Sequence, residues 1–187
     1  MFYLLNKIFF SRAERSQSVI AARRWRIASW AVYLLGLPPW LIIFVSERNW
    51  IAAGLEAGGT PAMLLGLIIA LRGKGRAPRW LDYVALLAIT VGIIYSLKDF
   101  GGLNTINQYL ELGLTLGFLV GTYQLAKEKP QGYLWFILMN LSCGSLMAVQ
   151  HYYWLMLQQM VSLGFVIDAY RTQKHRADQT DPDRIIT

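Results

Sequence analysis

"WLMLQQMVSLGF", residues 154–165, is an apolar run typical of a membrane-spanning helix, and Gln158 and Gln159 are its only amide side chains. A helix needs about 20 mainly apolar residues to cross a bilayer. The chain of 187 residues is 55% hydrophobic, and its apolar residues form long runs with few charges, which favours an integral membrane protein. The six predicted spans are residues 27–45, 50–71, 80–97, 103–126, 132–149 and 152–170.

The connections between these predicted spans alternate in charge. "RGKGRAPR" (72–79) and "KEKPQG" (127–132) are basic, whereas the other connections are short and near neutral. All Lys and Arg residues except Arg48 and Lys98 lie in the basic connections or in the terminal segments. Because Lys and Arg mark the cytoplasmic side of a membrane protein, we expect both termini in the cytoplasm. The predicted fold class is an all-α polytopic membrane bundle, with six transmembrane helices in three hairpins.

The same pattern predicts how the chain is organised. Residues 1–26 form a basic amphipathic arm on the cytoplasmic side, and residues 1–10, too short to span, lie in the membrane interface. Residues 27–171 form the transmembrane bundle, and residues 172–187 form a disordered cytoplasmic tail that contains "DQTDPDR". Whether the third span, which carries Asp82 near its start, and residues 1–10 cross the membrane stays open.

An internal repeat joins the fourth and sixth predicted spans. With a shift of 47 residues, "LELGLTLGFLVGTYQLAK" (110–127) lies over "LQQMVSLGFVIDAYRTQK" (157–174) without a gap. The shift places Glu111 on Gln158 and Gly117 on Gly164. Chance similarity between apolar segments is the alternative explanation. A repeat would build the bundle from related hairpins around a shared central path.

Polar side chains recur at one depth in the predicted spans. Glu56, Glu111 and Gln158 lie about 10 Å below the outer ends of their helices, at 1.5 Å per residue. A carboxylate there costs about 2.5–3.5 kcal/mol on insertion scales, so it should face the bundle interior and have a partner or a function. Adjacent Gln158 and Gln159 point about 100° apart, so one can line a path while the other bridges helices.

Other candidates for a solute site are an amide and two tryptophans. Asn140 can both donate and accept hydrogen bonds, although bridging between helices would explain it equally well. Trp40 follows Pro38 and Pro39 and is placed to stack on a planar ligand, whereas Trp135 near a span end is by default an interfacial anchor. For Asp168, an ion pair with Arg171 one turn away is the expected role.

Several function classes are excluded or set aside. His151 and Cys143 lack an orienting carboxylate, and there is no paired-His metal motif or phosphate-binding loop, so we expect no enzyme activity, metal or cofactor. The net charge of +7 lies at the ends of the apolar runs, where anionic lipid explains it better than nucleic acid. The expected partners are the bilayer and a small-molecule solute, and a homo-oligomer stays possible.

The last third of the chain resembles a known transporter family. "GYLWFILMNLSCGSLMAVQHYYWLMLQQMVSLGFVIDAYRTQKH" (132–175) is similar to the C-terminal hairpin of the nicotinamide riboside transporter (PnuC) family, related to the SWEET sugar transporters. Trp135, Asn140, Trp154 and Gln158 or Gln159 occupy positions of the family pattern. The resemblance implies uptake of a pyridine nucleoside or related vitamin by facilitated diffusion across a bacterial inner membrane. That family has seven core helices, as three plus one plus three, whereas six are predicted here.

The sequence therefore predicts a transporter for a small planar solute such as nicotinamide riboside, a nucleoside or a vitamin. The expected substrate-binding residues are Trp40, Glu56, Glu111, Trp135, Asn140, Gln158 and Gln159. Proton coupling through Glu56 and Glu111 is an alternative within transport. A non-transporting membrane scaffold or assembly subunit, with the polar residues bridging helices, is the alternative outside it.

Overall fold

The computed structural model describes residues 2–46, 50–73, 78–99 and 105–180. Within these ranges the fold is all-α, with seven helices and no strand. The first helix was not predicted as part of the bundle. The helices are α1 (Phe2–Arg15), α2 (Val19–Ser46), α3 (Trp50–Arg72), α4 (Arg79–Asp99), α5 (Ile106–Ala126), α6 (Gln131–Val149) and α7 (Tyr153–Thr180).

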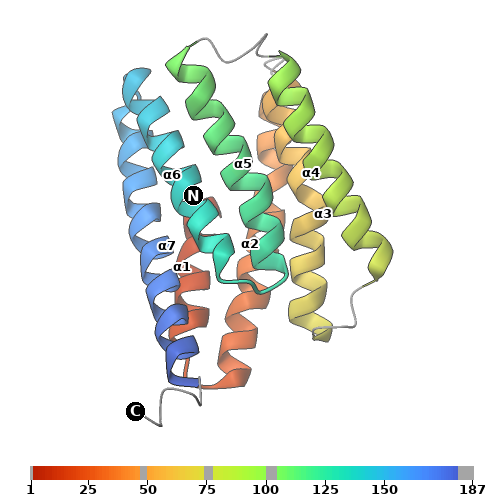
Figure 1. Cartoon of the computed structure of the whole chain (residues 1–187), viewed down its shortest axis with the longest axis vertical. Helices are drawn as coiled ribbons and strands as arrows, with labels where there is room; N and C mark the ends of the chain where they lie inside the picture. Colours follow the sequence, from red (N-terminus) through yellow and green to blue (C-terminus); the bar gives the residue numbers. More distant parts are fainter. Residues whose placement is uncertain (1, 47–49, 74–77, 100–104, 181–187) are drawn as a thin grey trace.

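Six helices form a closed ring, and α4 lies outside it. Around the ring the contacts run from α1 to α2, α3, α5, α6 and α7, and α7 returns to α1, whereas α4 packs on α3 and α5 (Figure 1). The α1–α2 and α5–α6 connections and the end of α7 lie at the lower end in Figure 1, which we call the basic end. Of the segments that the charge pattern assigned to one side, the α5–α6 connection and the C-terminal end of α7 therefore lie at the same end of the bundle.

The N-terminal segment is a part of this ring, which corrects the prediction of a separate arm. Helix α1 begins near mid-height and runs to the basic end between α2 and α7 (Figure 1). Its side chains Asn6, Lys7, Phe10, Ser11 and Glu14 are buried. At 14 residues, or about 21 Å at 1.5 Å per residue, α1 fills its place in the ring only in the lower half of the bundle.

Two helices extend beyond the predicted spans. The second helix, Val19–Ser46, contains the predicted span 27–45 and begins eight residues before it, and it continues through Pro38 and Pro39. Helix α7 continues to Thr180, so the predicted disordered tail is helical over 172–180, and residues 181–187 lie outside the described residues. Amphipathic ends that carry charge extend both helices beyond the apolar runs that the prediction followed.

The contact between α5 and α6 depends on glycine. A Cβ on Gly117 would lie 2.6 Å from the carbonyl oxygen of Trp135, and one on Gly121 would lie 2.6 Å from the ring of Phe136. Small residues let helix backbones approach closely, as is common in membrane bundles. At Gly164, the repeat partner of Gly117, a Cβ would meet nothing within 4 Å. The two aligned helices therefore use their shared glycine differently.

The outside of the bundle is apolar in several places. Trp80, Tyr83 and Leu87 of α4 and Trp154 and Leu157 of α7 are exposed. Among the described residues, two helical segments are long and apolar enough to cross a membrane by length and composition, namely Gly54–Arg72 and Gln131–Val149. These two segments agree with a membrane protein, and the prediction of six spans goes beyond them.

Candidate functional site

A buried lysine lies in the middle of the ring. The Lys7 side chain is 3% exposed, and its Nζ atom lies 3.3 Å from the centre of the Phe136 ring and 5.1 Å from that of Tyr33. This Nζ atom has no hydrogen-bond partner among the described residues. Three helices, α1, α2 and α6, thus meet at one ammonium group. We call Lys7, these two aromatic residues and the residues linked to them by chain position, hydrogen bonds or ring contacts the central cluster: Tyr3, Asn6, Lys7, Ser29, Tyr33, Glu56, Phe136 and Asn140.

Asn6 ties α1 to α2 beside this lysine. Its Nδ2 atom donates to the carbonyl oxygen of Ser29 at 3.1 Å and to the Ser29 hydroxyl oxygen at 2.8 Å, and that hydroxyl donates to the Asn6 carbonyl at 3.0 Å. Both side chains are fully buried. The Oδ1 atom of Asn6 has no hydrogen-bond partner in the described ranges of the chain. The pair thus holds α1 in register on α2 and leaves one acceptor unused.

Glu56 enters the cluster from α3. The Tyr3 hydroxyl lies 2.6 Å from its Oε2 atom and donates a hydrogen bond to it. Burial of Lys7 disfavours its charged form, and the negative charge of the nearby Glu56 offsets a part of this effect. The prediction that Glu56 faces the interior and has a partner is met by a residue of α1, which the sequence did not suggest as a neighbour.

Asn140 is buried in α6, at 2% exposure. Its Nδ2 atom donates to the carbonyl oxygen of Phe136, one turn earlier in the same helix, at 2.6 Å. Its Oδ1 atom has no hydrogen-bond partner in the part of the chain that the structure describes. The side chain therefore makes no hydrogen bond to another helix there, and the alternative of an interhelical bridge does not account for it.

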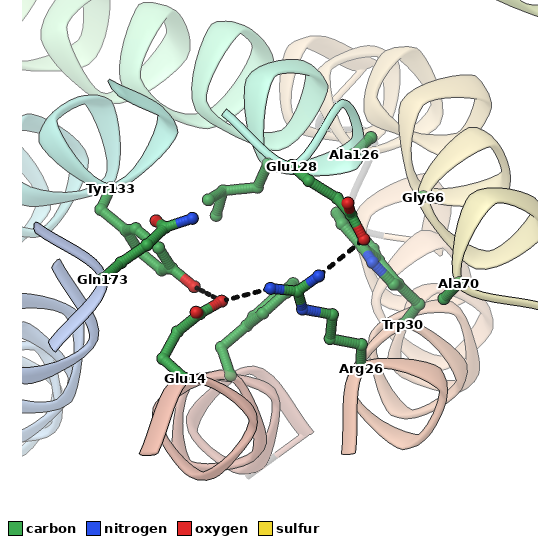
Figure 2. Close-up of a pocket in the computed structure, with 11 residues that line it drawn as sticks. Glu14, Arg26, Trp30, Gly66, Ala70, Ala126, Glu128, Tyr133 and Gln173 are labelled. Atoms are coloured by element: carbon green, nitrogen blue, oxygen red, sulfur yellow. Dashed lines mark hydrogen bonds and ion pairs between the residues drawn. The ribbon is translucent and has the colours of Figure 1, made fainter. Parts of the chain in front are cut away.

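A second group of polar residues, the basic-end network, joins several helices of the ring through Glu14, Arg26, Glu128 and Tyr133 (Figure 2). Arg26 of α2 donates from Nη2 to Glu14 Oε1 at 3.1 Å and from Nη1 to Glu128 Oε1 at 2.6 Å. The hydroxyl of Tyr133 donates to the same Glu14 oxygen at 3.1 Å. Glu14 is only 4% exposed, so this carboxylate depends on its partners. The network joins α1, α2, α6 and the α5–α6 connection.

The pocket between these residues is too small for a solute. Phe10, Trp30 and Gln173 also line it, and its volume is about 10 Å³, roughly the space of one water molecule. Figure 2 shows the side chains of Glu14 and Arg26 pointing toward one another across it. The basic end of the ring is therefore closed in this structure.

Helix α1 is fixed to α7 at the same end. The Ser11 hydroxyl donates to Asp168 Oδ2 at 2.6 Å, and Arg15 donates from Nε to the same oxygen at 2.9 Å. The hydrogen bond to Asp168 raises the pKa of the Arg15 guanidinium above its ordinary value. The expected pairing of Asp168 with Arg171 was wrong, because α1 supplies a hydroxyl and a guanidinium for this carboxylate.

A similar pairing holds α4 to α5. Asp82 accepts hydrogen bonds from Tyr123 and from Lys127, each at 2.7 Å. Lys127 therefore has a structural partner. Near the basic end, Asp82 thus holds α4 beside the ring. In the sequence, Asp82 had made the third predicted span uncertain.

The remaining predicted site residues do not join the central cluster. Glu111 on α5 and Gln158 and Gln159 on α7 are partly buried, and no hydrogen bond or ion pair among the described residues links their side chains to it. A Cβ on Gly144 would lie 3.7 Å from the Gln159 Cβ, so the Cβ atom of Gln159 lies on the side of α7 that faces α6. Trp135 is partly buried and lines a groove between α4 and α6, and the side chain of Trp40 lies outside the described residues.

Lys7, at the centre of the cluster, was missed at the sequence level. The available signal was "FYLLNKIFF" (2–10), in which Asn6 and Lys7 interrupt an otherwise apolar run. The run is too short to span a membrane, so its polar residues were assigned to the interface. Comparison with models of known protein families, with curated proteins and with solved structures finds no match to this chain.

Proposed function

We propose that the protein is a membrane transporter that binds a small planar solute at the central cluster. One observation carries the proposal: within the helical ring, Lys7, Asn6 and Asn140 each have a buried polar atom that finds no hydrogen-bond partner among the described residues. Buried polar atoms are nearly always hydrogen-bonded, so an exception asks for an explanation. A solute that donates to the amide oxygens and accepts from the lysine supplies it.

The aromatic residues around these atoms suit a planar solute. Tyr33 lies at 5.1 Å and Phe136 at 3.3 Å from the Lys7 ammonium, measured to the ring centres. Tyr3 packs edge to face on Tyr33, with ring centres 5.2 Å apart. Aromatic side chains offer flat apolar faces for stacking and, in tyrosine, a polar tip. We therefore assign the solute ring to this layer.

The membrane arrangement that accompanies this proposal has α2 to α7 as spans and α1 as a half-length helix inside the bundle. It places the basic end in the cytoplasm, as the distribution of Lys and Arg suggests. The apolar side chains exposed on α4 and α7 support a lipid-facing surface. A half-length helix is tolerated at membrane depth because its neighbours in the ring cover it.

The resemblance to the nicotinamide riboside transporter family adds support. That family's core has seven helices, three plus one plus three. The seven helices here, with α4 outside the ring between two sets of three, have the same number and order. In the proposal, transport is facilitated diffusion by alternating access across a bacterial inner membrane.

The basic-end network acts as the inner gate in this scheme. Release of the solute to the cytoplasm requires Arg26 to separate from Glu14 or Glu128, which now close the ring below the site. We assign the predicted residues Glu111, Gln158 and Gln159, which do not join the central cluster, to the route by which the solute reaches it.

Thermal unfolding of the purified protein in detergent, against a panel of nucleosides and vitamins, tests the proposal. A ligand at about 100 times its dissociation constant should add about 2.7 kcal/mol to the stability. Asn140→Ala should abolish the shift, whereas Gln150→Ala, an exposed amide beyond the end of the same helix, should keep it. Uptake of the same ligand into proteoliposomes should follow the shift.

The opposite result is equally informative. A panel without any stabilising ligand, together with no uptake, would reject the transporter and favour a membrane scaffold. If uptake depends on external pH, and if this dependence is lost in Glu56→Gln and Glu111→Gln, the mechanism would be proton-coupled transport and not facilitated diffusion.

A further inference from the structure

We infer that the solute carries a single negative charge, as a carboxylate, and that this group pairs with the ammonium of Lys7. The inference rests on the proposed function, because it names the substrate class of the same site. It also separates the site from permanently cationic solutes such as pyridinium nucleosides, which Lys7 would repel.

The first step is that Lys7 is the donor that lacks an acceptor. Ser29 is hydrogen-bonded to Asn6, and Glu56 accepts a hydrogen bond from the Tyr3 hydroxyl at 2.6 Å. The ammonium of Lys7 has up to three N–H donors and no hydrogen-bond partner in the described chain. A hydrogen-bond acceptor of a bound solute can therefore pair with the Lys7 ammonium without displacing a partner within the described chain.

The second step is that no described group in contact with Lys7 carries a compensating charge. The contacting groups are Tyr33 from α2 and Phe136 from α6, which interact with an ammonium through their ring faces. Such cation–π contacts are weaker than the cost of removing an ammonium from water, so these rings offset only a part of it. Lys7 thus destabilises the empty protein, as expected of a charge whose partner arrives with the ligand.

The third step concerns Glu56, the carboxylate whose charge acts on Lys7. It accepts a hydrogen bond from Tyr3 and forms no ion pair with Lys7 within 4 Å. Because Glu56 already places one negative charge near Lys7, every negative charge on a solute adds to an excess, so a singly charged group is favoured over a doubly charged one such as a phosphate. The carboxylate is the planar group with a single negative charge.

The fourth step adds the donors that the solute must carry. The Oδ1 atoms of Asn6 and Asn140 are buried acceptors without a donor among the described residues. Hydroxyl or N–H groups on the solute, in addition to its carboxylate, are the kind of group that these oxygens lack. The substrate class is therefore a small, planar or partly planar carboxylic acid with hydrogen-bond donors.

The test uses pairs of compounds that differ only at the acid. We would measure unfolding temperature and proteoliposome uptake with nicotinate and nicotinamide and with pantothenate and panthenol, and with nicotinamide riboside as a cationic comparison. The proteins are the wild type, Lys7→Arg, Lys7→Met and, as a matched control, the exposed Lys129→Met. In the wild type and in Lys129→Met, the acid of at least one pair should raise the unfolding temperature and be taken up at least tenfold better than its neutral partner or the cationic riboside.

The variants of Lys7 separate binding from folding. Lys7→Met should unfold at a higher temperature than the wild type without ligand and should lose the shift with the acid. Lys7→Arg should keep a preference for the acid. A role of Lys7 in folding alone would instead lower the unfolding temperature of Lys7→Met.

The failures of the two proposals are distinguishable. A neutral or cationic member that stabilises the wild type and Lys7→Met equally would overturn the carboxylate inference and leave the transporter standing. No shift and no uptake with any compound would reject both. If Lys7→Met does not fold, the comparison of acid and amide in the wild type still decides, because equal effects of both members overturn the inference.

Discussion

The central cluster and the basic-end network are built from similar residues but satisfy them differently. Each contains buried charges and tyrosine hydroxyls contributed by several helices of the ring. At the basic end Glu14 accepts from both Arg26 and Tyr133, whereas at the centre Lys7 Nζ has no acceptor. A buried charge is tolerated when it is paired and is costly when it is not. The difference suggests that the end holds the helices together and the centre is kept for a ligand.

The largest expected effect is at the basic end. Arg26→Met removes the cation beside the buried carboxylate of Glu14, so the free energy of unfolding should fall by about 3 kcal/mol, at the low end for a broken buried pair because Arg26 is partly exposed. Denaturant or thermal unfolding in detergent measures the change.

The pairing can be checked with a second change. Glu14→Gln in the Arg26→Met background removes the charge that was left alone and should recover a part of the loss, which gives a favourable coupling energy. Additive effects of the two substitutions would mean that the network does not act as a unit, and the contrast with the centre would disappear.

The same kind of substitution at the centre should have the opposite sign. Lys7→Met replaces an unpaired buried ammonium by an apolar side chain of similar length, and it should add about 1–2 kcal/mol to the stability of the ligand-free protein, as replacements of buried charges often do. A loss of stability larger than 1 kcal/mol, measured under the conditions used for Arg26→Met, would mean that Lys7 stabilises the fold as Arg26 does, and the contrast between the two regions would be wrong.

A smaller effect is expected where α1 meets α7. Ser11 is buried and donates to Asp168, so Ser11→Ala should lower the free energy of unfolding by about 1 kcal/mol, the usual worth of one hydrogen bond. Arg15→Ala, at the same carboxylate but in solvent, should have a smaller effect that vanishes as salt is raised. A larger and salt-independent effect at Arg15 would contradict this order.

Prediction from the sequence succeeded where one segment carries its own signal. The all-helical fold follows from apolar runs of membrane length, and Glu56 and Asn140 stood out because each is polar within such a run. The inward position of Glu56 and its need for a partner could be argued from the cost of a carboxylate alone. These inferences require no knowledge of which helices are neighbours.

Prediction failed where the partner is distant in the chain. Ser11 and Asp168 are separated by 157 positions, and Tyr3 and Glu56 by 53. The sequence offered Arg171 as a local partner for Asp168, and only the packing of α1 beside α7 shows why that choice was wrong. Helix α1 itself was misplaced because its short, basic sequence satisfies the rules for an interfacial helix as well as those for a buried half-length helix.

The smallest expected effect is at the aligned positions Glu111 and Gln158. They test whether polar side chains of α5 and α7, outside the central cluster, also lack a structural role. Both side chains are partly buried, and their side-chain atoms have no hydrogen bond or ion pair in the described part of the chain. Glu111→Gln and Gln158→Ala should therefore change the free energy of unfolding by less than about 0.5 kcal/mol, as substitutions away from packed or paired groups do.

If these residues belong to the route of the solute, the same two variants should slow uptake in proteoliposomes while leaving the ligand-induced shift at the central cluster in place. A loss of stability above 1 kcal/mol would instead mean that they bridge helices. A loss of the ligand shift would move the binding site toward them. Either result would reduce the contrast between a paired end and an unpaired centre, because the polar groups of α5 and α7 would then have structural or binding roles of their own.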